Sequence, residues 1–463
     1  MSIETINPLA SHDRLSTLGR WLRSARVLNA VTALAALLAL LDIFAIYRAT
    51  QGNPYPYWKN NTDFGGYIGA SQAVLAGQNI YEYKPCPCNL LYGTTEIHDQ
   101  YPYPPLFAEL LIPIVLLGDQ AARYIWLAIS VLCIVGTVAL LMRGFGTAIR
   151  WPWVALTLAV IGASHLIRND LYHGQVNLLL VFLITLGLWL HAKGHPIAAG
   201  LIIGVPLVVK PFLGIVLIYF LWRRQWKTAF TIGLTSATLL VVSFIPPYIS
   251  LGLPGVLHWL ETSAYYSSHA IAARPDNYSW NGILLRLFSA NYFTTPWVES
   301  DLLYRAISLG ALALFAGLFG LAVPGRRAAT RSPIGPAPLM LAEVGLLIGL
   351  TMTLGPMTEQ DHLLMLTPGL AGVLLIAYQS YQSQSAQRGA WLAAAVAWVV
   401  FYMLLFPPIP LSYGLPPSSA WVRLTGASIL LTARIGLMLL ILTGLLARAL
   451  RRERGGARGA APA

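Results

Sequence analysis

Long uninterrupted apolar runs constrain this chain more than any other feature of its sequence. Several of them extend for roughly 18 residues or more, and at about 1.5 Å per residue a helix of that length crosses a hydrocarbon core of about 30 Å. Apolar residues make up 56% of the 463 residues and charged residues only 10%, which excludes an ordinary soluble globular protein. The sequence therefore predicts an all-α, multi-pass integral membrane protein.

The basic residues occupy short segments between the apolar runs. The formal net charge of +12 would suggest a nucleic-acid partner for a soluble domain. In a membrane protein, however, short loops rich in Lys and Arg lie on the cytoplasmic side. We therefore expect no nucleic-acid partner, and we assign seven basic segments to the cytoplasm: Arg14 to Arg26, Arg143 to Arg150, Lys193, Arg223 to Lys227, Arg326 to Arg331, Arg388, and Arg448 to Arg458.

The apolar runs between these basic segments predict about 12 transmembrane helices in a single membrane domain, with both termini in the cytoplasm. The predicted spans include Ala121 to Met142, Leu302 to Val323, Leu339 to Leu354, Trp391 to Phe406 and Leu424 to Leu446. The first run, from Leu28 to Tyr47, is longer than a signal-peptide core of about 7 to 15 residues, so we interpret it as an uncleaved signal anchor. Residues 1–27 and the basic tail 449–463 are then cytoplasmic, and the tail is expected to lie near anionic headgroups.

Two long polar loops, 48–120 and 246–301, fall on the opposite, external side and carry nearly all of the polar complexity of the chain. The run Leu106 to Leu117, of about 12 residues, is too short to span a bilayer and is expected to lie in the interface or to re-enter. We find no pair of matching halves, which weakens the case for a transporter built from inverted repeats. The asymmetry indicates that the function is carried out on the external side.

The segment Ile197 to Trp222 is basic at both ends, which requires an even number of crossings. Two short helices broken near Lys210 and Pro211 satisfy this requirement, because proline interrupts a helix. Lys210 would then lie near the tip of a short hairpin. The polar stretch Arg168 to Gly174 is expected to be a turn between two helices.

The sequence offers no pattern typical of a metal or cofactor site. Cys86, Cys88 and Cys133 cannot form a four-ligand zinc site, and neither long loop contains a DxD pair. We therefore expect no cofactor and no metal requirement.

Asp63, in the first external loop, precedes a segment that is typical of an amphipathic helix ending near Gly77. Asn61, Thr62 and Asp63 are also ordinary N-cap residues, so a purely structural role is an alternative. Asp42, inside the first apolar run, is a second choice, since an intramembrane carboxylate is costly and often functional.

Five segments in the first 290 residues or so carry a resemblance to a known family: DFGGYIGASQAVLAGQNIY, YPYPPLFAELLIP, HGQVNLLLVFLITLGLWL, GLIIGVPLVVKPF and NYSWNGILLRLF. Their order resembles the GT-C superfamily of membrane glycosyltransferases, and most closely glycosyltransferase family 87. That family includes polyprenyl-phosphate-mannose-dependent mannosyltransferases of phosphatidylinositol mannoside synthesis. The resemblance implies a GT-C fold and sugar transfer from a lipid phosphate donor.

The resemblance implies that Asp63 is the catalytic base, which takes the proton of the acceptor hydroxyl in an inverting transfer. Because the leaving group is a phosphate, positive groups are needed beside it. The candidates are Lys210, Arg168, His173 and Arg286. The alternatives are snorkelling to the interface for Lys210, an interfacial anchor for Arg168, and an arginine facing headgroups for Arg286.

In TMTLGPMTEQDHLLML, Asp361 and His362 take the place where the family typically has two histidines. His362 is a further candidate for the donor phosphate, with capping of the next helix as the alternative, and Asp361 is a candidate for substrate binding. Gln175 and Asn177 are expected to hydrogen-bond sugar hydroxyls or neighbouring helices. Tyr103 is expected to stack on a sugar ring or to belong to the interfacial aromatic belt.

The sequence therefore predicts a glycosyltransferase of the bacterial cytoplasmic membrane whose active site faces outside. It would move a hexose, mannose by resemblance, from a polyprenyl-phosphate donor to a hydroxyl of an envelope glycolipid or glycan. The expected partners are this donor, the acceptor and membrane lipids. Two rival functions remain: a transporter or flippase for a lipid-linked or polar solute, and a noncatalytic subunit of an envelope complex.

Overall fold

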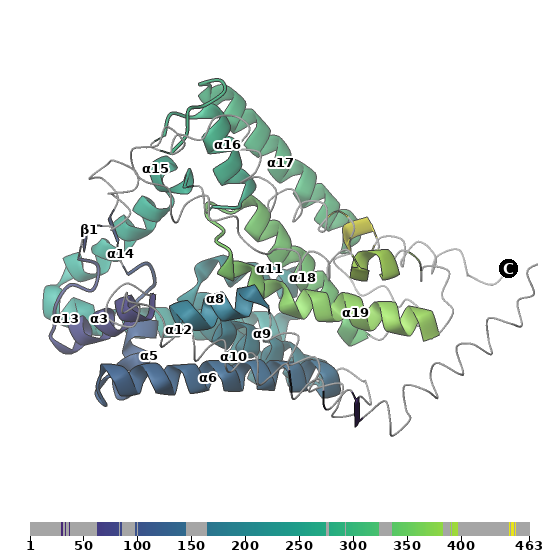
Figure 1. The fold of residues 1–463 in the computed structure, drawn as a ribbon, viewed down its shortest axis with the longest axis horizontal. Helices are drawn as coiled ribbons and strands as arrows, with labels where there is room; N and C mark the ends of the chain where they lie inside the picture. Colours follow the sequence, from purple (N-terminus) through teal and green to yellow (C-terminus); the bar gives the residue numbers. More distant parts are fainter. Residues whose placement is uncertain are drawn as a thin grey trace, which may run out of the picture.

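The computed structural model is a helical bundle (Figure 1). It describes chiefly residues 63–82, 101–144, 164–323 except 275, 276 and 292, then 336–382 and 391–396, with a few single positions elsewhere. The helices are α3 (Asp63–Leu75), α5 (Leu106–Val115), α6 (Asp119–Ala139), α8 (His165–His173), α9 (Asn177–Ala192), α10 (Pro196–Val209), α11 (Ile215–Trp222), α12 (Trp226–Ser243), α13 (Ile245–Leu251), α14 (Leu253–Tyr266), α15 (His269–Ala272), α16 (Trp280–Phe288), α17 (Asp301–Ala322), α18 (Pro336–Leu354) and α19 (Thr367–Gln382).

Shorter elements connect these helices. A π-helical turn, η1, covers Leu140–Gly144, and 3₁₀ turns η2 and η3 cover Pro211–Gly214 and Asp361–Leu366. The strands of the described residues, β1 (Lys84–Pro85) and β2 (His98–Asp99), pair antiparallel within the first polar loop.

The multi-pass prediction is confirmed. Within the described residues, five helices are long and apolar enough to span a membrane, or six if the bent pair α8 and α9 is one span: Asp119–Met142, Trp226–Leu251, Asp301–Ala322, Pro336–Leu354 and Asp361–Ser380. The total of about 12 stays a prediction, because the runs Leu28 to Tyr47 and Leu424 to Leu446 lie almost entirely outside the described residues, and Trp391 to Phe406 lies mostly outside them.

The predicted turn at Arg168 to Gly174 is wrong. These residues form most of α8, and the reversal is made instead by a bend of 117° between α8 and α9. Leu166 and Ile167 are buried on α8, so the segment has an apolar face that its polar appearance concealed. The bounds of the second external loop, 246–301, stay a prediction; helix α13 (Ile245–Leu251) covers its first residues.

The chain breaks at Lys210 as predicted. Lys210 has extended backbone angles, which the following Pro211 favours. Helices α10 and α12 run parallel, since Gly200 lies against Thr231 and Gly204 against Thr235. The intervening α11 must therefore run in the opposite direction, so the reversal at Lys210 is a feature of the structure.

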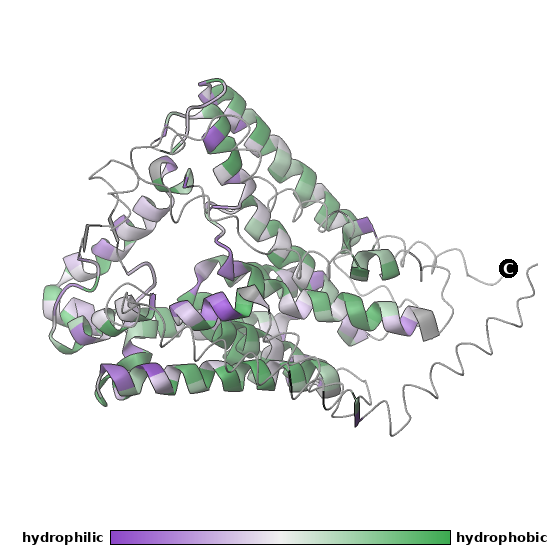
Figure 2. Ribbon diagram, in the orientation of Figure 1, coloured by the Kyte–Doolittle hydropathy of each residue, from purple (hydrophilic) through white to green (hydrophobic). Residues whose placement is uncertain are grey.

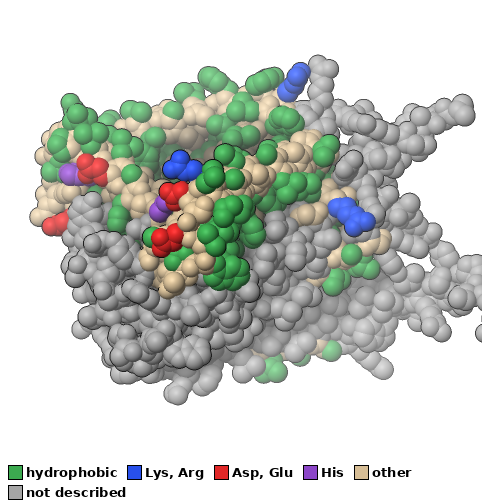
Figure 3. Space-filling view, turned by 90° about the horizontal axis from the view of Figure 1, so that it is seen from above, with side chains coloured by type: hydrophobic (Ala, Val, Ile, Leu, Met, Phe, Trp, Pro, Cys, Tyr) green, Lys and Arg blue, Asp and Glu red, His purple; other side chains and the backbone are tan. Residues whose placement is uncertain are grey.

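The core of the bundle is formed by helices that are apolar on every side. Of the most apolar 18 residues of α18, 78% are buried, whereas in α17 only 11% of the corresponding residues are buried. Gly345 of α18 and Gly369 of α19 bring the two backbones into direct contact, which small residues allow in membrane bundles. Apolar residues dominate the long helices (Figure 2), and few charged side chains interrupt the described surface seen from above (Figure 3).

The two ends of the bundle can be told apart through α9. At its last turn, His191 lies 2.9 Å from the hydroxyl of Thr228 and packs on Phe220, close in sequence to Lys193, Arg223 and Lys227. At its first residue, Asn177 contacts Lys210 instead. The predicted cytoplasmic segments of α9 to α12 therefore gather at one end, and the candidate site lies at the other.

Candidate active site

Asp63 is the first residue of α3, where the helix dipole favours a negative charge. Its carboxylate oxygen Oδ2 accepts a hydrogen bond of 2.6 Å from Nε2 of Gln175 and lies 3.8 Å from Nδ1 of His173. The side chain of Asp63 is 46% exposed, so a substrate can reach it. Asn61, Thr62 and Asp42, which entered the alternative readings of this loop, lie outside the described residues.

The bend between α8 and α9 brings His173 and Gln175 to Asp63. Gly174 ends α8 with a φ of +64°, a left-handed conformation that glycine adopts without cost. A Cβ at Gly174 would lie 2.6 Å from Cβ of Phe64, so the bend also packs directly against the start of α3. Nε1 of Trp126, on α6, donates to the carbonyl of Gly174 at 2.9 Å and holds the bend in place.

Two tyrosines extend the contacts of Gln175 toward Lys210. The hydroxyl of Tyr67 donates to Oε1 of Gln175 at 2.9 Å and lies 3.3 Å from the hydroxyl of Tyr103. Burial raises the pKa of both phenols well above the usual value of 10, because a buried phenolate is poorly solvated. Both tyrosines therefore remain neutral hydrogen-bonding groups at physiological pH.

Lys210 is buried next to the ring of Tyr103. It is 3% exposed, so it does not snorkel to an aqueous surface in this structure. Its Nζ donates to Oδ1 of Asn177 at 2.8 Å and lies 5.4 Å from the ring centroid of Tyr103. Nδ2 of Asn177 in turn donates to Oδ1 of Asp170 at 2.8 Å.

Asp361 and His362 begin η3 close to Lys210. Asp361 is 7% exposed and, like Glu359, lies within electrostatic range of Lys210. Nδ1 of His362 accepts from the backbone N–H of Glu359 at 3.2 Å, and its ring packs 5.6 Å from that of Phe212. Nδ1 of His362 is thus engaged by the backbone just before η3, and η3 has no side-chain cap hydrogen bond at Gln360; phosphate binding by His362 stays a prediction.

The two arginine candidates occupy different environments. Arg168 is exposed on α8. Arg286, on α16, is fully buried, and its guanidinium donates to the carbonyls of Arg274 at 2.6 Å and Asn277 at 3.0 Å. These contacts stabilise the segment before α16; phosphate binding by Arg168 or Arg286 stays a prediction.

Asn277 links that segment to the one that carries His362. Its side chain donates to the carbonyls of Ala272 and Pro356 and accepts from the backbone N–H groups of Ser279 and Thr358. A buried amide that satisfies four backbone groups ties the second polar loop to the start of η3.

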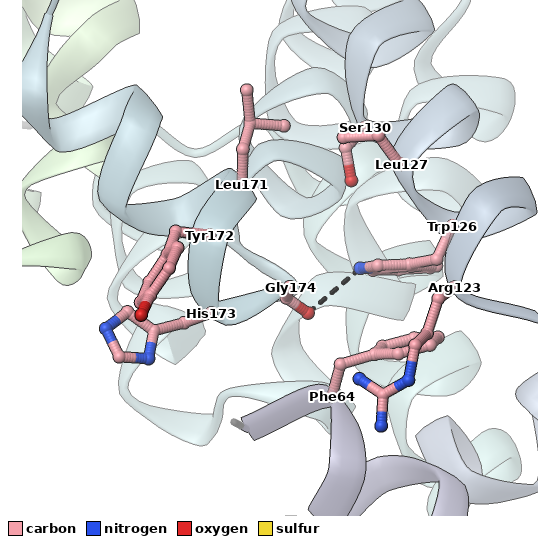
Figure 4. A pocket seen from close by; sticks show the side chains of 9 residues that line it. All are labelled: Phe64, Arg123, Trp126, Leu127, Ser130, Leu171, Tyr172, His173 and Gly174. Atoms are coloured by element: carbon pink, nitrogen blue, oxygen red, sulfur yellow. Dashed lines mark hydrogen bonds between the residues drawn. The ribbon is translucent and has the colours of Figure 1, made fainter. Parts of the chain in front are cut away.

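A shallow hollow opens next to Phe64 and His173, between α3, α6 and α8. Figure 4 shows Phe64, Trp126 and Arg123 on one side of it and Tyr172 and His173 on the other, with Gly174 between them. The guanidinium of Arg123 lies 5.9 Å from the ring centroid of Phe64. Asp63 precedes Phe64, which lines this hollow, and is linked to Lys210 through Gln175, Tyr67 and Tyr103.

Sequence reasoning missed three residues of this arrangement. Asp170 was assigned to a turn, although an acidic residue beside apolar runs is a signal of function. Tyr67 and Asn277 carried no individual signal, because their roles depend on contacts with residues distant in the chain, such as Gln175, 108 positions from Tyr67.

The described residues contain no group of three His, Cys, Asp or Glu side chains that could hold a metal ion. Cys133 is buried with a free thiol, and Cys86 and Cys88 lie outside the described residues. The expected independence from metals is left to experiment.

The model of glycosyltransferase family 87 matches residues 101–353, slightly more than half of the chain. Two curated relatives are α-(1→3)-arabinofuranosyltransferases. The protein from Corynebacterium glutamicum is 25% identical over 376 residues, covering 79% of this chain and 77% of the relative. The protein from Mycobacterium tuberculosis H37Rv is 30% identical over 232 residues, covering 47% of this chain and 48% of the relative.

A third relative is the polyprenol-phosphate-mannose-dependent α-(1→2)-phosphatidylinositol mannoside mannosyltransferase of Mycolicibacterium smegmatis. It is 26% identical over 346 residues, covering 71% of this chain and 72% of the relative. No solved structure matches the chain.

Proposed function

The chain belongs to glycosyltransferase family 87, and from this premise we propose that it transfers a sugar from a polyprenyl-phosphate donor to a hydroxyl of an envelope glycolipid or glycan. The oxygen of that hydroxyl attacks the anomeric carbon, and its proton passes to the Asp63 carboxylate. The bond from the anomeric carbon to the phosphate oxygen breaks, so polyprenyl phosphate leaves with the bonding electrons. Attack opposite to the leaving group inverts the anomeric configuration.

The position of Asp63 carries this proposal. Its carboxylate is accessible, is held by Gln175 at 2.6 Å, and is linked through Gln175, Tyr67 and Tyr103 to the buried ammonium group of Lys210. A general base needs this combination of access and fixed orientation. Gln175 and Asn177, which were expected to hydrogen-bond sugar hydroxyls or neighbouring helices, are assigned here to holding Asp63 and Lys210, respectively.

The donor phosphate is proposed to bind at Lys210, with His362 beside it. A buried ammonium group interacts more strongly with a phosphate than an exposed one, since water screens the charges less. Tyr103, in contact with Lys210, and Asp361 would face the donor sugar. His173, 3.8 Å from Asp63, would help to bind or orient the substrate from the hollow side, and Arg168 would contact headgroups or phosphate at the exposed face of α8.

The active site is proposed to face the outside of a bacterial cytoplasmic membrane. The basic segments of α9 to α12 gather at the opposite end of the bundle from Asp63, and basic segments stay in the cytoplasm. Both termini would then be cytoplasmic, in a single GT-C domain of about 12 spans. The loops around 48–120 and 246–301 would be external and cover the site.

The names of the curated relatives divide between arabinofuranosyl and mannosyl transfer. Mannose, expected from the resemblance, is therefore one of two sugars to test. The common element that we propose is a sugar linked to polyprenyl phosphate, the donor named for the M. smegmatis mannosyltransferase.

The test is release of polyprenyl phosphate by purified protein in detergent or proteoliposomes. Polyprenyl-phosphate-mannose and polyprenyl-phosphate-arabinofuranose are supplied separately, with a lipid extract as the source of acceptors. Asp63→Asn is compared with Asp119→Asn. Asp119 is a matched control, because it also begins a helix and also accepts a hydrogen bond from a glutamine, Gln72.

We expect turnover of one donor by the wild type and by Asp119→Asn, and none by Asp63→Asn. A fully active Asp63→Asn protein refutes the assigned base. If the wild type turns over neither donor, the polyprenyl-phosphate donor is wrong for this chain.

A further inference from the structure

Asp170 is a buried carboxylate that the proposed transfer reaction does not use directly. It is fully buried on α8, and its Oδ1 accepts a hydrogen bond of 2.8 Å from Nδ2 of Asn177. Oδ1 of the same amide accepts from Nζ of Lys210 at 2.8 Å. Asp170, Asn177 and Lys210, from three different elements, are each no more than 3% exposed.

This chain of contacts determines the orientation of the amide. An amide offers two donors on nitrogen and only acceptors on oxygen, and an ammonium group offers donors alone. Lys210 therefore takes the amide oxygen of Asn177, which leaves the amide nitrogen to donate to Asp170. The ammonium group is held at the end of this relay, against the ring of Tyr103.

The surrounding charges determine what Asp170 can contribute. Four carboxylates lie within electrostatic range of Lys210: those of Asp361, Glu359, Asp170 and Asp63. Glu359 is engaged by Arg274 at 3.7 Å, and Asp63 is 46% exposed. Of the four, Asp361 has the strongest electrostatic interaction with Lys210. Asp170 is fully buried and is joined to Lys210 by two hydrogen bonds through Asn177.

We propose that Asp170 is a positioning residue that, through Asn177, keeps Lys210 charged and oriented toward the phosphate of the donor. This inference rests on the proposed function. A buried ammonium group without a nearby carboxylate favours its neutral form, and a neutral amine has no net charge with which to attract a phosphate. The groups facing Lys210 that also titrate are the four carboxylates, Tyr103 and His362.

The decisive experiment is the pH dependence of kcat/KM for the donor between pH 6 and 10. In Asp170→Asn, the loss of activity at high pH is expected to begin at least about one pH unit lower than in the wild type. At a pH where the activity of both proteins is falling, kcat/KM of the variant is then about tenfold lower. Asp170→Glu keeps the charge and is expected to restore most of the wild-type profile.

Lys210→Arg provides the second half of the test. A guanidinium stays charged without a carboxylate partner, so adding Asp170→Asn to Lys210→Arg is expected to cause no further shift of the profile. Glu343→Gln is the matched control: Glu343 is also buried, 1% exposed, and is paired with Tyr219 and Arg223 at the opposite end of the bundle. Glu343→Gln is expected to leave the pH profile unchanged.

Binding of radiolabelled farnesyl phosphate, a short analogue of the leaving group, separates this inference from the proposed function. We expect the wild type to bind it, and Asp170→Asn to bind it at least tenfold more weakly at pH 8. A wild type that turns over donor while Asp170→Asn keeps the wild-type pH profile and farnesyl phosphate affinity overturns the inference alone. A wild type that neither turns over donor nor binds farnesyl phosphate overturns both.

If Asp170→Asn does not fold, Asn177→Leu tests the same relay. Leucine has nearly the shape of asparagine but makes neither hydrogen bond, so the dissociation constant for farnesyl phosphate is expected to rise about tenfold. An unchanged dissociation constant contradicts the role of the relay.

Discussion

Replacing Gly174 by alanine tests whether the bend between α8 and α9 sets the position of the catalytic base. Gly174 has a φ of +64°, and its missing Cβ would lie 2.6 Å from Cβ of Phe64, the residue after Asp63. Two carbon atoms in contact are normally about 3.5–4.0 Å apart. In Gly174→Ala, the start of α3 must therefore move by about 1 Å, and Asp63 must move with it.

Gly194→Ala provides the control. Gly194 also follows a helix with a positive φ, +85°, but a Cβ there would meet no atom within 4 Å. In both variants the free energy of unfolding is expected to fall by about 1–2 kcal/mol, because alanine is strained in a left-handed conformation. Gly174→Ala has a further packing cost of about 1–3 kcal/mol. Since a 1 Å displacement of a catalytic group lowers rates by about 100-fold, Gly174→Ala alone is expected to lose about that factor in kcat.

The assay is release of polyprenyl phosphate at saturating donor, with the folded fraction of each variant measured by size-exclusion chromatography and thermal unfolding in detergent. Correction for the folded fraction is expected to leave Gly194→Ala close to the wild type and Gly174→Ala about 100-fold slower. If a folded Gly174→Ala protein keeps wild-type kcat, the contact between the bend and α3 does not control the base, and the proposed site geometry is refuted.

Three further changes have outcomes that follow from the structure. In Gln175→Met, loss of the hydrogen bond to the Asp63 carboxylate, about 1.5–3 kcal/mol for a charged acceptor, is expected to lower kcat by roughly 10- to 100-fold, and an unchanged kcat contradicts this role. Asn277→Ala is expected to lower the unfolding temperature and raise the KM for the donor, because the second loop loses its link to η3; a wild-type KM would show that this link is unimportant. Addition of EDTA is expected to leave turnover unchanged, since a monophosphate leaving group carries less charge than a nucleotide diphosphate, and recovery of lost activity by added Mg²⁺ would contradict metal independence.

Local features of the chain were readable without the fold. The break at Lys210 was predicted from Pro211, which interrupts a helix, and from the basic residues at both ends of the segment, which require an even number of crossings. Both signals can be read from a short stretch of sequence. The spans now assigned to α6, α17 and α18 followed from their uninterrupted apolar runs. The helix α8 was mistaken for a turn, because a short helix with a mixed face is stabilised mostly by what it packs against.

The sequence by itself determined that this protein lies in a membrane, since transfer of apolar side chains into lipid depends on composition and run length alone. Only the tertiary structure decided which polar residues meet. Asp63 and Gln175 are 112 positions apart, and Lys210 and Asn177 are 33 apart. Such contacts depend on the bend at Gly174 and on which helix faces pack together, and hydrogen bonds require donor and acceptor to approach within about 3 Å.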